Sequence, residues 1–349
     1  MVIARIDPAS DRRWQTFVEN RPDAGIFHTA AWLEALRLTY GYQPVVYTAT
    51  DRGDSLLNGM PFCLIRSRLT GRRLVSLPFS DHCQPLGNPE ETHELLAAVK
   101  DDARKNNCKY VETRPLTPYT PGITSAAELT ESHDAVIHRL DLQQGRDEVF
   151  RGFHKDCIQR KISRSQREQL RYEEGRSEEL LQKFYRLLLL TRRRHQLPPQ
   201  PVLWFRNLIG CLGEKLKIRV ASSNDGIPVA SIITLLFNHV VTYKYGCADA
   251  RFNALGGMVL LIWRTVQEAL NEGAVELDLG RSDHDTPGLI AFKDHWGARR
   301  YRLTYYTHPE HTRASANGRL VMAAGKRLVA AIPDPLFTTL GGLLYRHVG

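Results

Sequence analysis

The first third of the chain alternates between helical and extended periods of hydrophobic positions. Helical periodicity covers residues 10–40 in pieces and stops at the Tyr40-Gly41 break. Apolar runs typical of strands follow, separated by turns and by one amphipathic helix at 91–106; these runs are 44–50, 60–65, 74–77 and 110–114. The order of helix, strands, helix and strand predicts an α/β or α+β domain.

The rest of the chain repeats this kind of alternation. Residues 115–134, rich in Pro, Thr, Ser and Gly, are predicted to form an exposed loop before a strand at 136–142. Four helices are then expected, at about 147–172, 177–195, 202–212 and 258–270. Between the last two, three apolar runs predict a strand meander, at 217–221, 229–237 and 240–245.

The densest cluster of charge follows the last predicted strand. In Ala274–Leu279 apolar and acidic residues alternate with period two, which predicts a strand with one buried face. We expect this strand to end at Gly280 and a polar loop to cover 281–285. A short amphipathic helix over 289–296 should then end with Gly297 as its C-cap. Strand ends of this kind are where α/β proteins usually bind ligands.

Composition narrows the class of protein. A chain of 349 residues, 42% hydrophobic and 24% charged, is expected to fold into two globular domains. It has no apolar run long enough for a membrane span, and its first residues lack the apolar core of a signal peptide, so a cytoplasmic location is expected. Six scattered cysteines without a C-x-x-C pair argue against a zinc ribbon or a disulfide framework.

The net charge of +9 favours an anionic partner: a phosphate, a nucleotide, RNA or an anionic membrane surface. DNA is not an expected partner. Arg160, Arg164, Arg167 and Arg171 are spaced four, three and four residues apart, which places them on one stripe of the predicted helix 147–172. The stripe either binds an anion or is a solvated face whose charge is relieved by neighbouring glutamates.

Several motifs, taken in order, resemble those of the Fem-type (FemAB-like) aminoacyl- and acyltransferases. The most specific are D-L-G-R-S at 278–282 and G-L-x-x-F-K-x-x-W-G at 288–297. Earlier parts of the chain carry supporting motifs: Phe27-His28 with Trp32, Tyr40-Gly41-Tyr42, Ser76-Leu77-Pro78-Phe79, and Tyr243-Lys244-Tyr245-Gly246 with Asp249 and Phe252. The resemblance implies two tandem domains of the acetyltransferase (GNAT) fold, at 1–141 and 142–310, with residues 311–349 packing back on the first.

The same resemblance implies an enzyme that forms an amide by transferring an acyl or aminoacyl group to an amine. It links the protein to cell-envelope or exopolysaccharide metabolism, such as peptidoglycan, at the inner face of the membrane. No tightly bound cofactor is expected, and the donor is acyl-CoA or aminoacyl-tRNA. Residues 251–257 contain glycines without the R/Q-x-x-G-x-G/A spacing of acetyl-CoA enzymes, and the helices at 177–213 are too short for the coiled-coil arm of some tRNA-dependent relatives. The expected acceptor is an anionic small molecule or a nucleotide-linked substrate.

Acyl transfer to an amine needs proton removal, oxyanion stabilisation and positioning of both substrates. We assign catalytic roles to Lys293, Asp278 and Tyr243, and expect Lys293→Ala to abolish transfer with little change in melting temperature. The candidates for substrate binding are Arg281, Tyr245, Arg160, Arg164, Arg167, Asp249, Phe292 and His82.

Each candidate also has a structural interpretation. Lys293 would otherwise be a surface lysine, Asp278 and Arg281 an ion pair that shapes the loop, and the two tyrosines parts of the core. A strand would place Tyr243 and Tyr245 on one face and Lys244 on the other. His82 beside Asp81 is either an acid–base pair or simply hydrogen bonded.

Two further interpretations concern the whole protein. Asp283, His284, Asp285 and His295 have ligand chemistry but no metal-binding spacing, so we predict no metal site. The alternatives to an enzyme are a basic protein that binds RNA or another nucleic acid without chemistry, and a scaffold that lacks catalysis.

Overall fold

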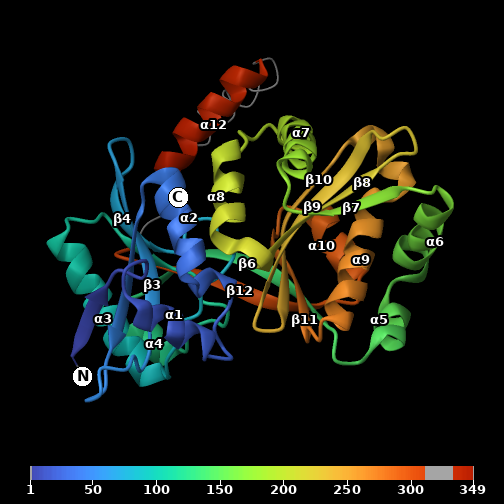
Figure 1. Ribbon diagram of the computed structural model, residues 1–349. Coiled ribbons are helices and arrows are strands. Elements are labelled where there is room, and N and C mark those ends of the chain that lie inside the picture. Colours follow the sequence, from blue (N-terminus) through green and yellow to red (C-terminus); the bar gives the residue numbers. More distant parts are fainter. Residues whose placement is uncertain (1, 311–332, 349) are drawn as a thin grey trace. The chain divides into compact units, whose positions relative to one another are not determined.

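A computed structural model describes residues 2–310 and 333–348 of the protein (Figure 1). These residues divide into two compact units. Unit 1 contains residues 2–135, 302–310 and 342–348, and unit 2 contains residues 136–301 and 333–341. Each unit is a mixed sheet with helices, so the predicted α/β class is confirmed.

Unit 1 holds six strands in the order β1-β2-β3-β4-β5-β12. Their bounds are Ile3–Ile6, Gln43–Ala49, Met60–Ser67, Gly71–Ser76, Val111–Thr113 and Arg299–His308. The first four form an antiparallel meander, β5 runs parallel to β4, and β12 pairs antiparallel with β5.

The helices of unit 1 begin and end at recognisable caps. They are α1 (Arg12–Glu19), α2 (Ala30–Tyr40), α3 (Pro89–Lys105) and α4 (Pro121–Ala126). Asn88 and Glu91 form a reciprocal capping box at the start of α3, and Gly41 at φ 69° ends α2. Leucines of α3 pack with β2–β4 in one core cluster, and the predicted helix over 91–106 is confirmed.

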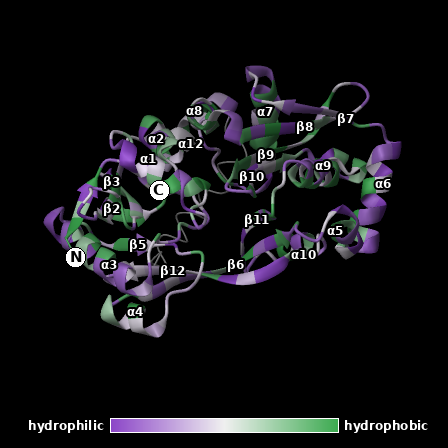
Figure 2. Cartoon of the chain, turned by 60° about the horizontal axis from the view of Figure 1, so that its bottom comes forward, coloured by the Kyte–Doolittle hydropathy of each residue, from purple (hydrophilic) through white to green (hydrophobic). Residues whose placement is uncertain are grey.

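Unit 2 holds strands in the order β6-β11-β10-β9-β8-β7. Their bounds are Thr130–Asp141, Glu276–Asp283, Val240–Ala248, Pro228–Phe237, Leu216–Ser222 and Arg171–Gly175. Strands β7–β10 are an antiparallel meander, and β11 runs parallel to β10. Hydrophobic residues are frequent on β8–β10 and on helix α8, Val202–Leu212 (Figure 2).

Two layers of helices cover the β7–β10 meander. Helix α9 (Gly257–Asn271) packs on one face through Leu260 and Leu261. Helix α7 (Glu178–Arg194) and α8 lie on the other face, where Phe184 and Phe205 contact Tyr245 of β10. Ser177 caps α7 by accepting a hydrogen bond from Leu180 N (3.2 Å), as predicted.

The two units share one order of elements. Unit 1 reads strand, two helices, three strands, helix and parallel strand, from β1 to β5. Unit 2 repeats this order from β7 to β11, with α9 as the crossover helix that α3 is in unit 1. The chain therefore contains a repeat of structure that its sequence does not reveal.

Three predicted elements were wrong. The helix expected over 147–172 is divided into α5 (Arg146–Gly152), a π-helical turn η2 (Lys155–Gln159) and α6 (Arg160–Arg167), and the chain then enters strand β7. The loop expected over 115–134 contains α4 and the start of β6. The strand expected at 274–279 extends through the polar residues to Asp283. In the first case, pairing with β8 outweighs the local sequence preference. In the third case, the other neighbour of β11 in the sheet is β6, since the pairing with β10 ends at Asp278.

The last described helix is α12 (Asp334–Val348). In unit 1, the hydroxyl of Tyr42 donates to the carbonyl of Tyr345 (2.5 Å). In unit 2, Arg193 pairs with Asp334 and lies over the ring of Phe337. The rest of the predicted tail, residues 311–332, lies outside the described residues. Among those described, no helix combines the length and apolar character that a membrane crossing requires.

Candidate active site

The parallel strands β10 and β11 pair over a short length only. Their register joins Val240 to Glu276, Val241 to Leu277 and Thr242 to Asp278. Both strands continue for five or six residues beyond these pairs, but the ladder between them ends there. The backbone that follows Thr242 on β10 is therefore not paired with β11.

A β-bulge in β10 lies where the two strands part. The register of β10 with β9 shifts between Tyr243 and Tyr245, so Lys244 is an extra residue. Tyr243 consequently packs toward α9, whereas Tyr245 packs against α7 and α8. The prediction that both tyrosines share one face was wrong, because the bulge shifts the alternation by one residue.

Tyr243 lies beside the parting of the strands. Its hydroxyl is 3.8 Å from the sulfur of Met258 on α9, and its ring crosses Gly246, where a Cβ atom would meet the hydroxyl at 1.7 Å. Burial raises the pKa of this phenol, which therefore stays protonated at neutral pH. Tyr243 can donate a hydrogen bond but is a poor base.

Tyr245 is occupied within the core of unit 2. Its hydroxyl accepts hydrogen bonds from Trp204 Nε1 (2.8 Å) and Gln200 Nε2 (3.2 Å). The residue is 9% exposed. This environment favours the structural interpretation of Tyr245 over substrate contact.

The end of β11 is bent at Gly280 and held by two charged side chains. Gly280 has a φ of 75°, and its N–H donates to Asp278 Oδ1 (2.7 Å). Lys293 of helix α10 (Pro287–Asp294) donates from Nζ to the carbonyls of Gly280 (2.8 Å) and Arg281 (2.9 Å). Asp278 and Lys293 are each 3% exposed, so Lys293 is not the surface lysine of the alternative interpretation. Both residues position the backbone at the point where β11 leaves β10.

Arg281, Phe292 and Asp249 lie near these strand ends but have partners in the protein. Arg281 forms an ion pair with Asp283 (3.3 Å), and Phe292 packs on the core cluster of Trp296. The carboxylate of Asp249 accepts from the backbone and guanidinium of Arg251, which lowers the pKa of the carboxyl. Asp249 thereby caps the short helix η4 (Ala250–Leu255) that leads into α9.

Helix α10 ends earlier than predicted. Its C-cap is His295, and Gly297 follows at φ 69°. A Cβ atom at Gly297 would lie 2.8 Å from the carbonyl oxygen of Gly152, so this glycine allows two backbone segments to approach closely.

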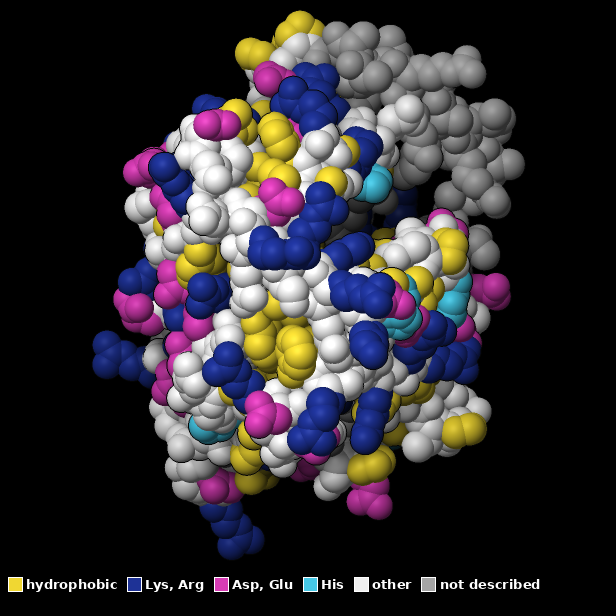
Figure 3. Space-filling model, turned by 90° about the vertical axis from the view of Figure 1, so that its right-hand side faces the viewer, with side chains coloured by type: hydrophobic (Ala, Val, Ile, Leu, Met, Phe, Trp, Pro, Cys, Tyr) yellow, Lys and Arg dark blue, Asp and Glu magenta, His cyan; other side chains and the backbone are white. Residues whose placement is uncertain are grey.

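Helix α6 carries four basic and no acidic residues. Arg160 pairs with Asp156 (2.8 Å) and Arg164 with Glu168 (3.3 Å), whereas Arg167 has no ion-pair partner within the described part of the chain. All three arginines are exposed. Lys and Arg side chains are numerous on the face of the molecule that Figure 3 shows. Arg171 lies on β7 rather than on the helix, so the predicted stripe is one residue shorter.

The start of α9 is packed against α6. A Cβ atom at Gly256 would lie 3.3 Å from the carbonyl of Lys161 and 3.5 Å from Ser165 Cβ. No side chain caps the first turn of α9. Ser165 is buried, whereas the arginines of α6 lie on the exposed side of the same helix.

His82 lies in unit 1, apart in sequence from the other candidates. Its ring makes an edge contact with Phe27 (5.5 Å). The neighbouring His28 donates from Nε2 to Gln84 O (2.7 Å) and accepts from Gly25 N (3.0 Å), and burial lowers its pKa to about 4. His28 is therefore neutral and structural.

Unit 1 contains a buried ion pair that was not predicted from the sequence. Arg114 donates to Glu112 Oε1 (2.7 Å) and to the carbonyl of Leu77 (2.7 Å), and it stacks over Tyr305. Both charged residues are less than 10% exposed. The sequence did not indicate this pair, because charged residues in or next to a short strand predict an exposed face rather than a buried one.

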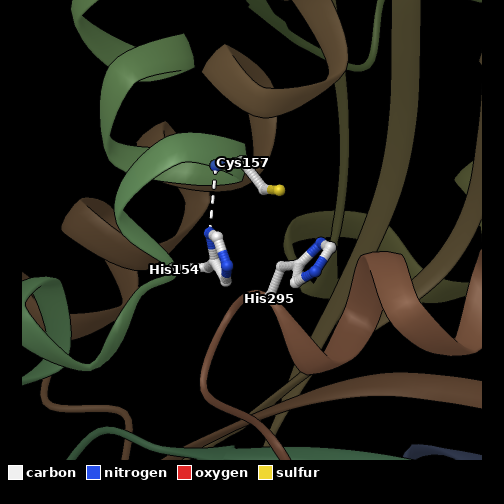
Figure 4. A group of neighbouring side chains, drawn as sticks. All are labelled: His154, Cys157 and His295. Carbon is white, nitrogen blue, oxygen red and sulfur yellow. Dashed lines mark hydrogen bonds between the residues drawn. The ribbon is translucent and has the colours of Figure 1, made fainter.

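Unit 2 contains a group of metal-ligand side chains that was also not predicted from the sequence. The ligand atoms of His154, Cys157 and His295 all lie within 4.8 Å of one another (Figure 4). The spacing H-x-x-C at 154–157 was the available signal, but the third residue lies far away in the sequence. Among the described residues, this is the one group in which at least three His, Cys, Asp or Glu side chains lie close enough to share a metal ion. Asp283, His284 and Asp285 do not belong to it.

Comparison with known proteins agrees with this architecture. Residues 153–302 match the family described as acetyltransferase (GNAT) domain, and no curated protein gives a significant match. FemX has a similar structure, with a TM-score of 0.69 at 14% identity over 93% of this chain and 100% of FemX. L-PGS from Bacillus licheniformis is similar at TM-score 0.57 and 12% identity, over 92% of this chain and 97% of L-PGS.

A tandem GNAT protein from the clavulanic acid biosynthesis pathway is also similar, with a TM-score of 0.55 at 14% identity over 89% of this chain and 99% of that protein. At these identities the likeness concerns the fold. It confirms the predicted pair of tandem GNAT-like units. The family match supports the expected resemblance to FemAB-like acyltransferases and assigns an acyltransferase domain to unit 2.

Proposed function

From a GNAT acyltransferase domain at residues 153–302, we propose that this protein transfers an acyl or aminoacyl group from an activated donor to an amine. A C–N bond forms at the carbonyl carbon while the bond to the leaving group breaks. One proton leaves the attacking amine, and one reaches the departing group. The observation that carries this proposal is the parting of β10 and β11 after only three paired residues.

The part of β10 that follows its short ladder with β11 is the proposed site of oxyanion stabilisation. A strand that leaves its neighbour presents N–H groups that no longer have a partner in that neighbour. Fixed N–H donors of this kind stabilise the charge that develops on a carbonyl oxygen during acyl transfer. The bulge at Lys244 and the clamp of Asp278 and Lys293 on Gly280 keep the two strand ends apart.

Tyr243 is the proposed proton donor. Its phenol stays protonated because burial raises its pKa, and it lies on the face of β10 that turns toward α9. A protonated hydroxyl at this point can donate to the leaving group or to the oxyanion. We therefore assign Tyr243 the catalytic role and assign Asp278 and Lys293 the role of positioning the backbone.

We place the reaction in cell-envelope or exopolysaccharide metabolism, on an anionic or nucleotide-linked acceptor. Support comes from the similarity in fold to FemX and L-PGS and from the basic character of the chain. The exposed arginines of α6 suit a polyanionic donor, either acyl-CoA or aminoacyl-tRNA. Six free cysteines suit a reducing compartment, so we propose the cytoplasm, with the inner membrane surface as a further place of action.

The test is a donor and acceptor screen with the full chain. Acyl-CoAs and aminoacyl-tRNA are each incubated with nucleotide-linked sugar peptides, and mass spectrometry detects the new amide. Thermal shift measured in parallel reports binding. Tyr243→Phe should lower the transfer rate about a hundredfold while leaving the thermal shift by the donor intact.

The matched control is Tyr301→Phe, which removes a hydroxyl from an exposed tyrosine and should leave transfer unchanged. Transfer that Tyr243→Phe leaves unaffected would remove Tyr243 from the mechanism. Salt-sensitive binding of RNA without any amide product would favour the nucleic-acid interpretation. Absence of both binding and product would favour a scaffold.

A further inference from the structure

Two segments of unit 2 bring three metal-ligand side chains together, outside the strands of the proposed active site. His154 and Cys157 lie at the start of η2, three residues apart and therefore on one side of a helical turn. His295 is the C-cap of α10. His154 is exposed, and Cys157 and His295 are half-buried, so an ion can reach the group from solvent.

The backbone holds the two segments in fixed contact. His154 N donates to the carbonyl of His295 (2.7 Å), which joins the two histidine positions directly. The ring centroids of His154 and His295 are 4.6 Å apart. The two segments also lie close together at Gly152 and Gly297, two residues from each histidine.

The residue before His154 and the residue after His295 fix both segments to the core of unit 2. Phe153 packs edge to face on Trp296 with ring centroids 4.9 Å apart. Both aromatic side chains are at most 2% exposed and belong to the core of unit 2. Each aromatic side chain is buried in the core, whereas His154 beside Phe153 is exposed and His295 beside Trp296 is half-buried. The ligand group is thus carried by a rigid part of the fold rather than by a free loop.

We propose that His154, Cys157 and His295 bind a thiophilic divalent cation of the zinc class. Two imidazoles and one thiolate are the donors that zinc takes in proteins. Tetrahedral coordination at the usual bond lengths separates such donor atoms by about 3.3–3.6 Å. The observed limit of 4.8 Å is within reach of side-chain rotation on a fixed backbone.

Binding involves a defined exchange of protons and hydrogen bonds. The thiol of Cys157 loses its proton to solvent as the sulfur–metal bond forms. His154 Nδ1 accepts the N–H of Cys157 (3.2 Å), so its neutral ring carries the proton on Nε2. The cation needs a lone pair of this ring, so it competes with the cap of η2: either it takes Nδ1, or the proton moves to Nδ1 and the cation takes Nε2.

Three protein ligands leave a fourth position for water or another donor. The bound cation would cross-link the segment before α6 to the end of α10, the helix that carries Lys293. The site is therefore distinct from the β10–β11 strand ends, and its presence does not depend on the transfer reaction.

The test uses Co²⁺ as a spectroscopic probe and Zn²⁺ as competitor on the chelator-treated full chain. We expect one Co²⁺ per chain, with a thiolate-to-cobalt charge-transfer band and the visible bands of tetrahedral cobalt, both removed by stoichiometric Zn²⁺. Cys157→Ser should abolish the charge-transfer band, and His295→Gln should weaken binding about a hundredfold or more. The matched control is Cys211→Ser, which alters another half-buried cysteine of unit 2 and should leave the spectrum unchanged.

A second measurement needs no variant. Alkylation followed by peptide mass spectrometry should show that Zn²⁺ protects Cys157 from modification and leaves the rate at Cys211 unaltered. The hydrogen exchange of the Cys157 amide should accelerate on binding, because its cap is lost. Absence of a stoichiometric Co²⁺ complex, equal protection of both cysteines, or a Cys157→Ser spectrum like that of the wild type would overturn the proposal.

Discussion

Replacing Lys293 with methionine tests whether the lysine positions backbone or takes part in chemistry. The substitution keeps most of the buried aliphatic volume and removes the ammonium that binds the carbonyls of Gly280 and Arg281. Each hydrogen bond from a charged donor contributes about 1.5–3 kcal/mol to stability. Removing the buried ammonium also removes its desolvation cost, which offsets part of the loss of the two bonds. We expect a net loss of about 2–4 kcal/mol in the free energy of unfolding. For a unit of this size that lowers the melting temperature by roughly 5–15 °C.

Calorimetry gives the melting temperature, and hydrogen–deuterium exchange resolved on residues 276–286 gives the local effect. Exchange in this peptide should rise in Lys293→Met, because the bend at Gly280 loses its clamp. The control is Lys161→Met, on an exposed lysine of α6, which should change neither quantity. A variant with wild-type melting and exchange but no transfer would refute the positioning role and restore the catalytic one. The expectation of an unchanged melting temperature came from treating Lys293 as a catalytic side chain without structural bonds.

Three further predictions follow from buried or exposed polar groups. Burial lowers the pKa of His28 from its ordinary 6.5 to about 4, so the unfolded state binds a proton before the folded state as the pH falls. The free energy of unfolding of unit 1 should therefore decrease by about 3 kcal/mol between pH 7 and pH 4 in acid titrations, and His28→Gln should remove this dependence. Tyr245→Phe deletes the acceptor of two buried hydrogen bonds and should lower stability by about 1–3 kcal/mol in urea unfolding. Reversing charge at Arg164 and Arg167 should weaken binding of a phosphate-bearing donor about tenfold, measured by calorimetric titration at low salt.

Each of these predictions has a matched control on an exposed residue. His93→Gln should leave the acid titration unchanged, and Tyr301→Phe should leave urea unfolding unchanged. Reversing charge at Arg104 and Lys105, about three-quarters exposed on α3, alters net charge equally and should not weaken donor binding. Equal losses of donor binding for the pair on α6 and the pair on α3 would mean that net charge, rather than α6, attracts the donor.

The sequence predicted the elements whose hydrophobic period is regular. Helices α3, α7, α8 and α9 and strands β8–β10 lie where the periodicity placed them, because their buried faces are continuous. Strand β7 was missed, since its charged residues gain their extended form from pairing with β8. The bulge at Lys244 has no signature in the sequence, and it reversed the predicted face of Tyr245.

The residues near Gly280 could be named as candidates from the sequence, but their contacts could not be predicted. The charged run after Leu277 lies within strand β11, and Asp278 and Lys293 both bind the backbone of that strand at Gly280. Their burial and their backbone partners depend on how α10 folds over β11, which the sequence does not reveal. His154, Cys157 and His295 needed three-dimensional proximity to be recognised as a group.

The late position of β12 in the chain bears on how unit 1 is completed during synthesis. Strand β5 pairs with β12 through Thr113 and Tyr306, yet residues 136–298 of unit 2 are translated between them. Until residues 299–308 leave the ribosome, β5 is an open edge and the Arg114 side chain lacks its Tyr305 cover. The sheet of unit 1 is thus completed only after residues 136–298 have been made, so a nonsense mutation just before codon 299 would also damage the unit that precedes unit 2.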